Sequence, residues 1–327
     1  MFGSQRIQRA GSCREFIPTE VTPIVLVKGA AYRFPLQPNN QIASAAWSPV
    51  EFVPILAAQR LLARIDPATL QGTVVLVRIA HVEAFEQRVP YVNPFDRKNL
   101  NRMFPGKADG TQAERIAWAI TTEVIRRSDL HVELHGGDGA EWMEAFAGPY
   151  GGPLAEAQYA QSRAMALAFG IRNVIKYEMK TQAQVDNGRS LNRQAVADGK
   201  PTVLVEIGQN GQRDEASIAT LTTGLENLLK TLKMTPGTPT PPRADTRWFG
   251  DSAEASATTT GIFTPVATTG RAVRKGDLIG TVTDYAGTEI ERIVSPVDGY
   301  VMYGLAGPPV RAGEAVVTIG IPAASPR

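Results

Sequence analysis

The chain contains three histidines, and any histidine-based chemistry must use them: His81, His131 and His135. His131 and His135 lie in the segment 129–138 (DLHVELHGGD), whose β-branched content and Gly-Gly end favour a strand. On one face of a strand they would lie roughly 13 Å apart at about 3.3 Å per residue, so one metal ion cannot be bound directly by both. His135, at the strand end, is the better candidate metal ligand. The alternative interpretation of each histidine is a hydrogen-bonded structural role, which we favour for His131 and for His81.

Two further segments carry side chains suited to hydrolysis. Glu206 ends the apolar run 202–206 (TVLVE). Burying a carboxylate there costs free energy unless it forms an ion pair or takes part in a reaction. Beside a metal-bound water it would suit a general base, and the alternative is a paired structural carboxylate. Asn101 and Arg102 lie in the loop 99–106 (NLNRMFPG). An arginine fork binds carboxylates and a neighbouring amide adds orientation, whereas the alternative is an ion pair that fixes the loop.

The periodicity of the chain predicts the elements that must position these residues. Short apolar runs predict buried strands, and apolar residues at helical spacing predict helices between them. Alternation of this kind predicts an α/β fold with a mixed, mostly parallel sheet and helices on both faces. Active sites of such sheets lie beyond the carboxyl ends of the strands. The proline- and asparagine-containing segment 31–50 reads as a long irregular loop. The predicted strands are 23–27, 73–79, 129–134, 173–177 and 201–207, and the predicted helices are 51–65, 111–127, 154–169 and 214–232.

The composition changes at residues 235–247 (TPGTPTPPRADTR), which read as a linker. Glycine-punctuated short strands follow, and the segment 273–276 (VRKG) recurs as 310–313 (VRAG). This quasi-repeat indicates two similar β-units folded together, as in barrel-sandwich domains. We therefore predict a catalytic domain over residues 1–240 and a small C-terminal all-β domain over residues 241–327.

The overall composition excludes several classes of protein. Net charge is +2, with 34 basic and 32 acidic residues well mixed, so we expect no nucleic-acid partner. No apolar run reaches the roughly 18 residues of a membrane span, and the first twenty residues lack the apolar region of a signal peptide. The single cysteine, Cys13, excludes an internal disulfide and fits a reducing cytoplasm. We therefore expect a cytoplasmic protein with a small-molecule partner, and a homo-oligomer remains possible.

Taken in order, these segments resemble the succinylglutamate desuccinylase/aspartoacylase family, relatives of the zinc carboxypeptidases, over roughly residues 54–320. The segment 92–106 (VNPFDRKNLNRMFPG) looks like the family's (D/N)LNR-x-FPG motif. The segment 133–137 (ELHGG) looks like its DLH-(S/G)-G strand, and 205–208 (VEIG) looks like the strand that supplies its general base. The segments from 270 and from 295 (GRAVRKGD, SPVDG) resemble the β-domain appended to many members.

This resemblance implies a zinc carboxypeptidase-like fold and hydrolysis of the amide bond of an N-acyl amino acid or a similar small amide. Zn²⁺ would be the cofactor, with His135 as one ligand. Glu206 would be the base that deprotonates the metal-bound water. Asn101 and Arg102 would hold the substrate carboxylate, and the cation of Arg102 would add to catalysis near the developing oxyanion.

The chain departs from the family at its first metal-binding motif, HG-x-E, which supplies two ligands. The best alignment places the segment 48–51 (SPVE) there, which keeps Glu51 as a metal ligand and replaces the histidine by Ser48. Residues 30–47 then become an insertion. Catalytic zinc normally has three protein ligands and one open position, so a replacement is needed. His81, at the end of a predicted strand that faces the cleft, is a candidate.

Three interpretations therefore compete. The first is an active zinc hydrolase with an altered site. The second is a degenerate, non-catalytic homologue that has lost zinc and acts as a binding or structural protein. The third is that residues 1–50 reflect a local frameshift or a misassigned start, because the family pattern is intact after about residue 54. The C-terminal domain has no lysine after Lys275, so a swinging-arm cofactor is not expected there.

Overall fold

A computed structural model of the chain describes residues 23–27, 41–46, 51–188 and 190–325. The helical elements are α1 (Phe52–Arg64), α2 (Val82–Gln87), η1 (Leu100–Arg102), α3 (Gln112–Ile120), the π-helical η2 (Thr121–Ile125), α4 (Glu156–Ala168), α5 (Gln182–Gly188), α6 (Leu191–Ala197) and α7 (Glu215–Thr231). The strands of the first part are β1 (Pro23–Val27), β2 (Gln41–Ala46), β3 (Thr73–Val77), β4 (Leu130–His135), β5 (Glu141–Met143), β6 (Phe146–Gly151), β7 (Asn173–Ile175), β8 (Tyr177–Glu178) and β9 (Thr202–Glu206).

The central sheet has the order β1-β3-β2-β4-β9-β6-β7. Its middle strands β3, β2, β4 and β9 are parallel to one another. β1 runs antiparallel to β3, β6 runs antiparallel to β9, and β7 is parallel to β6. The prediction of a mixed, mostly parallel sheet is therefore confirmed. The carboxyl ends of β4 and β9 meet at one edge of the sheet, where α/β proteins bind their ligands.

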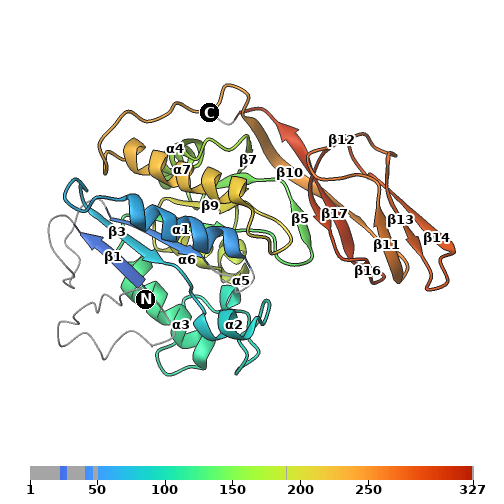
Figure 1. Cartoon of the computed structure of the whole chain (residues 1–327), viewed down its shortest axis with the longest axis horizontal. Helices are drawn as coiled ribbons and strands as arrows, with labels where there is room; N and C mark the ends of the chain where they lie inside the picture. Colours follow the sequence, from blue (N-terminus) through green and yellow to red (C-terminus); the bar gives the residue numbers. More distant parts are fainter. Residues whose placement is uncertain (1–22, 28–40, 47–50, 189, 326–327) are drawn as a thin grey trace, which may run out of the picture.

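Helices cover the two faces of this sheet (Figure 1). On one face α1, α4 and α7 pack over alternate residues of the strands, including Val132, Leu134, Val203 and Val205. On the other face α3, η2 and α6 form a second core with Val75 and Val77. The predicted helices at 51–65, 111–127, 154–169 and 214–232 are confirmed within a few residues at their ends. Among the described residues, no helix has the length and apolarity needed to cross a membrane.

The prediction of an irregular loop over residues 31–50 is wrong for residues 41–46, and its remaining residues, 31–40 and 47–50, lie outside the described part of the chain. Residues 41–46 (QIASAA) form β2, which lies inside the sheet between β3 and β4. A strand buried between two neighbours usually carries large β-branched residues, whereas this one carries alanine and serine and is flanked by prolines. Residues 41–46 form a strand despite their low β propensity because they pair with β3 on one side and β4 on the other.

The C-terminal region is built from antiparallel strands, and Figure 1 shows the long strands β10 and β17 running into it from the helix-covered body. Its core contains Phe263, Ile279, Val282 and Val316. Residues 232–246 form neither helix nor strand, and Arg247, the last residue of the linker predicted at 235–247, begins β10. β10 then pairs with β7 on one side and β17 on the other, so one sheet spans the predicted domain boundary. The strands are β10 (Arg247–Ser256), β11 (Gly261–Pro265), β12 (Ala272–Val273), β13 (Leu278–Thr283), β14 (Glu289–Val294), β15 (Gly299–Leu305), β16 (Pro309–Val310) and β17 (Ala315–Ala323).

The quasi-repeat forms two equivalent turns. In the first, the amide of Arg274 donates to the carboxylate of Asp277, and in the second the amide of Arg311 donates to Glu314. The glycine of each turn has a positive φ, 91° at Gly276 and 86° at Gly313, which favours glycine at both positions. The sequence repeat is therefore a structural repeat.

Candidate active site

The candidate site lies at the carboxyl ends of β4 and β9. The two strands pair in register, with His135 opposite Glu206. Because side chains alternate along a strand, Glu133 shares the face of His135, whereas Val132 and Leu134 enter the opposite core. Gly136 follows His135 directly, and a Cβ there would lie 2.7 Å from the carbonyl oxygen of Ile207, so the chain can turn this closely only with glycine.

His135 is held between two carboxylates. Its Nδ1 lies 2.9 Å from Oε2 of Glu51, and its Nε2 lies 3.0 Å from Oε1 of Glu133. The backbone N–H of Gly136 also donates to Glu51, at 2.9 Å. Glu51 stands immediately before α1 and Glu133 is 1% exposed, so both carboxylates have fixed positions. The structure therefore brings together the two predicted metal ligands, Glu51 and His135, which are 84 residues apart.

The site has more negative than positive charge. Burial lowers the pKa of His135, but Glu51, Glu206 and Glu133 together outweigh burial and hold that pKa well above its usual range. Burial also raises the pKa of Glu206 to about 8; His135 opposes this rise, and Glu51 and Glu141 add to it. Several carboxylates thus surround one imidazole, an arrangement in which a bound cation is favourable.

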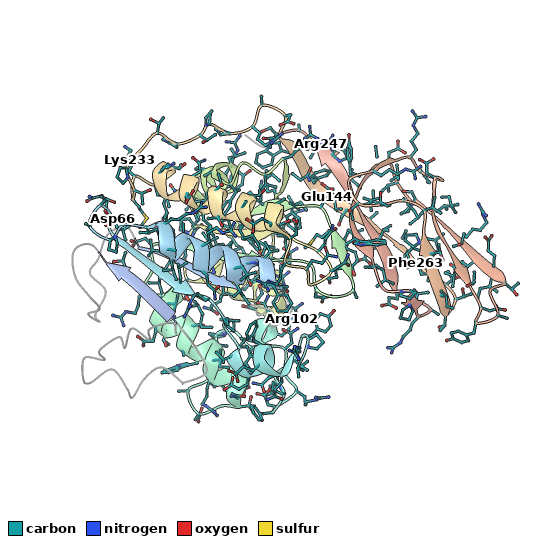
Figure 2. The ribbon with its side chains drawn as sticks, in the orientation of Figure 1. Asp66, Arg102, Glu144, Lys233, Arg247 and Phe263 are labelled. Carbon is teal, nitrogen blue, oxygen red and sulfur yellow. The ribbon has the colours of Figure 1, made fainter. Side chains whose placement is uncertain are left out.

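Arg102 and Asn101 belong to η1, beside this centre. They line a cavity of about 170 Å³ together with Glu51 and His135. Arg102 is exposed, and its guanidinium donates to the carbonyl of Asn101 at 2.8 Å (labelled in Figure 2). The side chain of Asn101 donates to Glu133 and accepts the N–H of Leu191. The structure thus makes Asn101 a support for Glu133, and its direct contact with substrate stays a prediction, as does that of Arg102.

The prediction that His81 ends a strand is wrong. β3 ends at Val77, and His81 is the N-cap residue of α2. The side chain is 4% exposed, lines the same cavity as His135, and places Nε2 2.8 Å from the amide nitrogen of Asn93. Asn93 Nδ2 also donates to Gln112. Because the amide of Asn93 already occupies Nε2, the geometry favours the structural role of His81 over that of a replacement ligand.

Sequence reasoning missed several residues at this site. Glu133 had a signal, because it lies two residues before His135 on one strand face. No pattern in the sequence pointed to Tyr177 or Arg193. Burial, and then the charges of Glu206 and Glu133, raise the pKa of Tyr177, whereas the charge of Arg193 lowers it. Glu141 of β5 is a further neighbour. Burial and then Asp138 raise its pKa to about 7, and Tyr303 of the C-terminal region lies close enough to be affected by it.

The donor set fits a zinc ion in part. Glu51 and His135 supply a carboxylate oxygen and an imidazole nitrogen, both zinc donors. Glu133 fits the carboxylate that accepts the other ring N–H of a zinc-bound histidine and fixes its tautomer. Among the described residues, no group of three His, Cys, Asp or Glu side chains is arranged to hold a metal. Ser48, which the sequence aligns with the missing histidine, lies outside the described residues.

Comparison with known proteins gives the family of the chain. Residues 44–232 match the model of the succinylglutamate desuccinylase/aspartoacylase catalytic domain. The chain is 30% identical to the N-alpha-acetyl-L-2,4-diaminobutyric acid deacetylase of Halomonas elongata over 240 residues, which cover 72% of this chain and 67% of that protein.

Solved structures share the whole fold. A product-bound ectoine utilization protein EutE (DoeB) from Ruegeria pomeroyi has a TM-score of 0.77 at 23% identity and covers 86% of this chain and 87% of its own. A succinylglutamate desuccinylase from Silicibacter sp. TM1040 has a TM-score of 0.78 at 22% identity, and the match covers 93% of this chain and 89% of that structure's chain. The family match over more than half of the chain, supported by these folds, shows that the chain belongs to the succinylglutamate desuccinylase/aspartoacylase family.

Proposed function

We propose that the chain is a zinc-dependent deacylase that hydrolyses the amide bond of an N-acyl amino acid or a similar small amide. One observation carries the proposal: His135 lies between Glu51 and Glu133, opposite Glu206, beside a cavity that Arg102 lines. The curated relative removes an acetyl group from an amino acid, which supports the reaction class.

Each residue has a distinct part in this reaction. Glu51 and His135 would hold zinc, which when bound would polarise the acyl carbonyl and lower the pKa of water. Glu133 accepts the N–H of His135 and so directs Nδ1 toward Glu51. Glu206, whose buried carboxyl has an affinity for protons above that of an exposed one, accepts a proton from the attacking water and delivers it to the departing amine. Arg102 binds the carboxylate of the substrate.

The non-catalytic alternative rests on the resemblance to the family, which aligns Ser48 with the histidine of the first metal-binding motif. Two donors bind zinc less tightly than three. A protein that has lost the metal would keep the fold and the cavity, and it could bind an amide without cleaving it. The same experiment decides between the two proposals.

We would load the purified chain with zinc, remove the excess by dialysis, and measure both bound metal and release of free amine from a panel of N-acetyl amino acids. We expect about one zinc per chain and turnover. His135→Ala should lose both. Glu206→Gln should keep the metal and lose about 10²–10⁴-fold in kcat, the usual share of acid–base catalysis. Glu289→Gln, an exposed carboxylate on β14, is the matched control and should change neither. No metal and no turnover would establish the non-catalytic alternative.

A further inference from the structure

A second and larger cavity lies away from the candidate active site. Its volume is about 540 Å³, within the range of small-molecule sites, and it shares no lining residue with the catalytic cavity. It lies where α4, the segment before β10, and the end of β17 meet. Figure 2 shows its residue Arg247 well separated from Arg102 of the catalytic cavity.

The side chains around this cavity are strongly basic. Arg163, Arg243 and Arg247 line it, and no aspartate or glutamate does so among the described residues. Asp245, which lies in the sequence between the lining residues Ala244 and Thr246, already binds two guanidiniums: Arg172 lies at 2.5 Å and Arg243 at 2.8 Å. Asp245 therefore neutralises Arg243, whereas neither Arg163 nor Arg247 forms an ion pair among the described residues. A guanidinium does not deprotonate in a protein, so these two positive charges require an external counterion or water.

Two of these arginines are held in place by aromatic rings. The guanidinium carbon of Arg247 lies 4.3 Å from the ring centre of Tyr300, and that of Arg163 lies 5.3 Å from that of Trp248. Stacking occupies the face of a guanidinium and leaves its N–H edge available. Because the rings restrict the side-chain rotamers, less entropy is lost when that edge binds a ligand.

The hydrogen bonding of Arg163 is incomplete. Its Nε is buried and has no acceptor among the described residues, and a terminal nitrogen donates to Oγ of Ser325 over a long distance of 3.4 Å. A buried N–H without an acceptor costs free energy, so hydrogen bonds to the described residues do not account for the position of the Arg163 guanidinium.

We propose that this cavity, which we call the arginine cavity (Arg163, Arg243, Arg247, Trp248 and Tyr300), binds a small organic oxyanion, a carboxylate or a phosphate ester. The guanidinium groups of Arg163 and Arg247, which form no ion pair among the described residues, would bind the oxyanion. The volume exceeds that of a single inorganic anion, and Leu167, Pro242 and Pro322 add apolar surface for an organic body. The binding does not depend on the catalytic activity.

Isothermal titration calorimetry at low ionic strength would test this with three probes: inorganic phosphate, citrate and adenosine monophosphate. We expect citrate or adenosine monophosphate to bind one per chain, about tenfold tighter than inorganic phosphate, because the organic body also buries apolar surface. A preference for citrate would identify the carboxylate class, and a preference for the nucleotide would identify the phosphate-ester class. Saturable binding of none of the three, or equal binding of inorganic phosphate, would overturn the proposal.

Variants locate the site. The double substitution Arg163→Gln/Arg247→Gln should weaken binding by about tenfold or more, because charge-assisted hydrogen bonds are lost. Arg247→Lys keeps the positive charge but loses the planar guanidinium, which can form two parallel hydrogen bonds, so it should weaken binding less than the double substitution does. Arg274→Gln, an exposed arginine that does not line the cavity, is the matched control, and Arg102→Gln separates this cavity from the catalytic one. Circular dichroism would confirm that each variant is folded. Binding lost in Arg102→Gln but kept in the double variant would refute the assignment.

Discussion

The substitution Glu133→Gln tests how the site holds its histidine. It preserves the shape of the side chain and removes its charge, 3.0 Å from Nε2 of His135. A carboxylate that accepts the second N–H of a metal-bound histidine typically contributes about 10–100-fold to metal affinity, which is roughly 1.4–2.8 kcal/mol. A charge-assisted hydrogen bond contributes about 1.5–3 kcal/mol, so the two estimates agree. We therefore expect zinc affinity to fall by about one to two orders of magnitude.

The stability of the metal-free protein should respond differently. Glu133 attracts the His135 imidazolium, but it also repels Glu206, so its neutralisation removes one favourable and one unfavourable interaction. We expect the free energy of unfolding to change by less than about 1 kcal/mol. The glutamine oxygen can still accept from Asn101, which donates to Glu133 at 3.3 Å.

Competition with a fluorescent zinc chelator would measure the affinity, and urea denaturation of the metal-free protein would measure the stability. Glu289→Gln on β14 provides the matched control and should leave both unchanged. Unchanged zinc affinity in Glu133→Gln would refute the role of Glu133 in positioning His135. A large loss of stability with no specific loss of zinc affinity would show that the carboxylate serves the fold instead.

Three further predictions concern stability. In the metal-free protein, burial and neighbouring carboxylates raise the pKa of Glu206 from 4.5 to about 8, so the folded state binds more protons than the unfolded state in this interval. The free energy of unfolding should therefore fall as pH rises from about 4.5 to 8, and Glu206→Gln should flatten this slope; a slope of the opposite sign in pH-dependent urea melts would contradict the site electrostatics. Asp214→Ala removes the side chain that accepts the Ser217 N–H at 2.8 Å at the start of α7, and should cost about 1 kcal/mol in urea denaturation, whereas a neutral result would show that this cap contributes nothing. Gly106→Ala places a Cβ 2.2 Å from the Trp118 amide nitrogen at a φ of +82°, so we expect a loss of more than about 1 kcal/mol; wild-type stability by thermal denaturation would show that the segment can shift.

Local patterns predicted most of the fold correctly. The runs at 73–79, 129–134 and 201–207 are strands, and the helical periodicity at 154–169 and 214–232 marks α4 and α7. These elements bury a continuous apolar face, so the periodicity of their apolar side chains is enough to predict their secondary structure. Elements whose local preference is weak were missed. β6 (Phe146–Gly151) is a strand of FAGPYG, with two glycines and a proline, and it forms because β9 and β7 pair with it.

The sequence by itself determined which residues were candidates for chemistry. Three histidines, the family motif around Asn101 and Arg102, and the strand ends at His135 and Glu206 follow from residue types and order. Only the tertiary structure decided how they meet. It brings Glu51 to within 2.9 Å of His135 across 84 residues, links Asn101 to Glu133, and places Tyr303 of the C-terminal region near Glu141. The arginine cavity likewise joins α4, β10 and the chain's last strand. Such contacts depend on strand order and on packing between distant segments, which local periodicity does not contain.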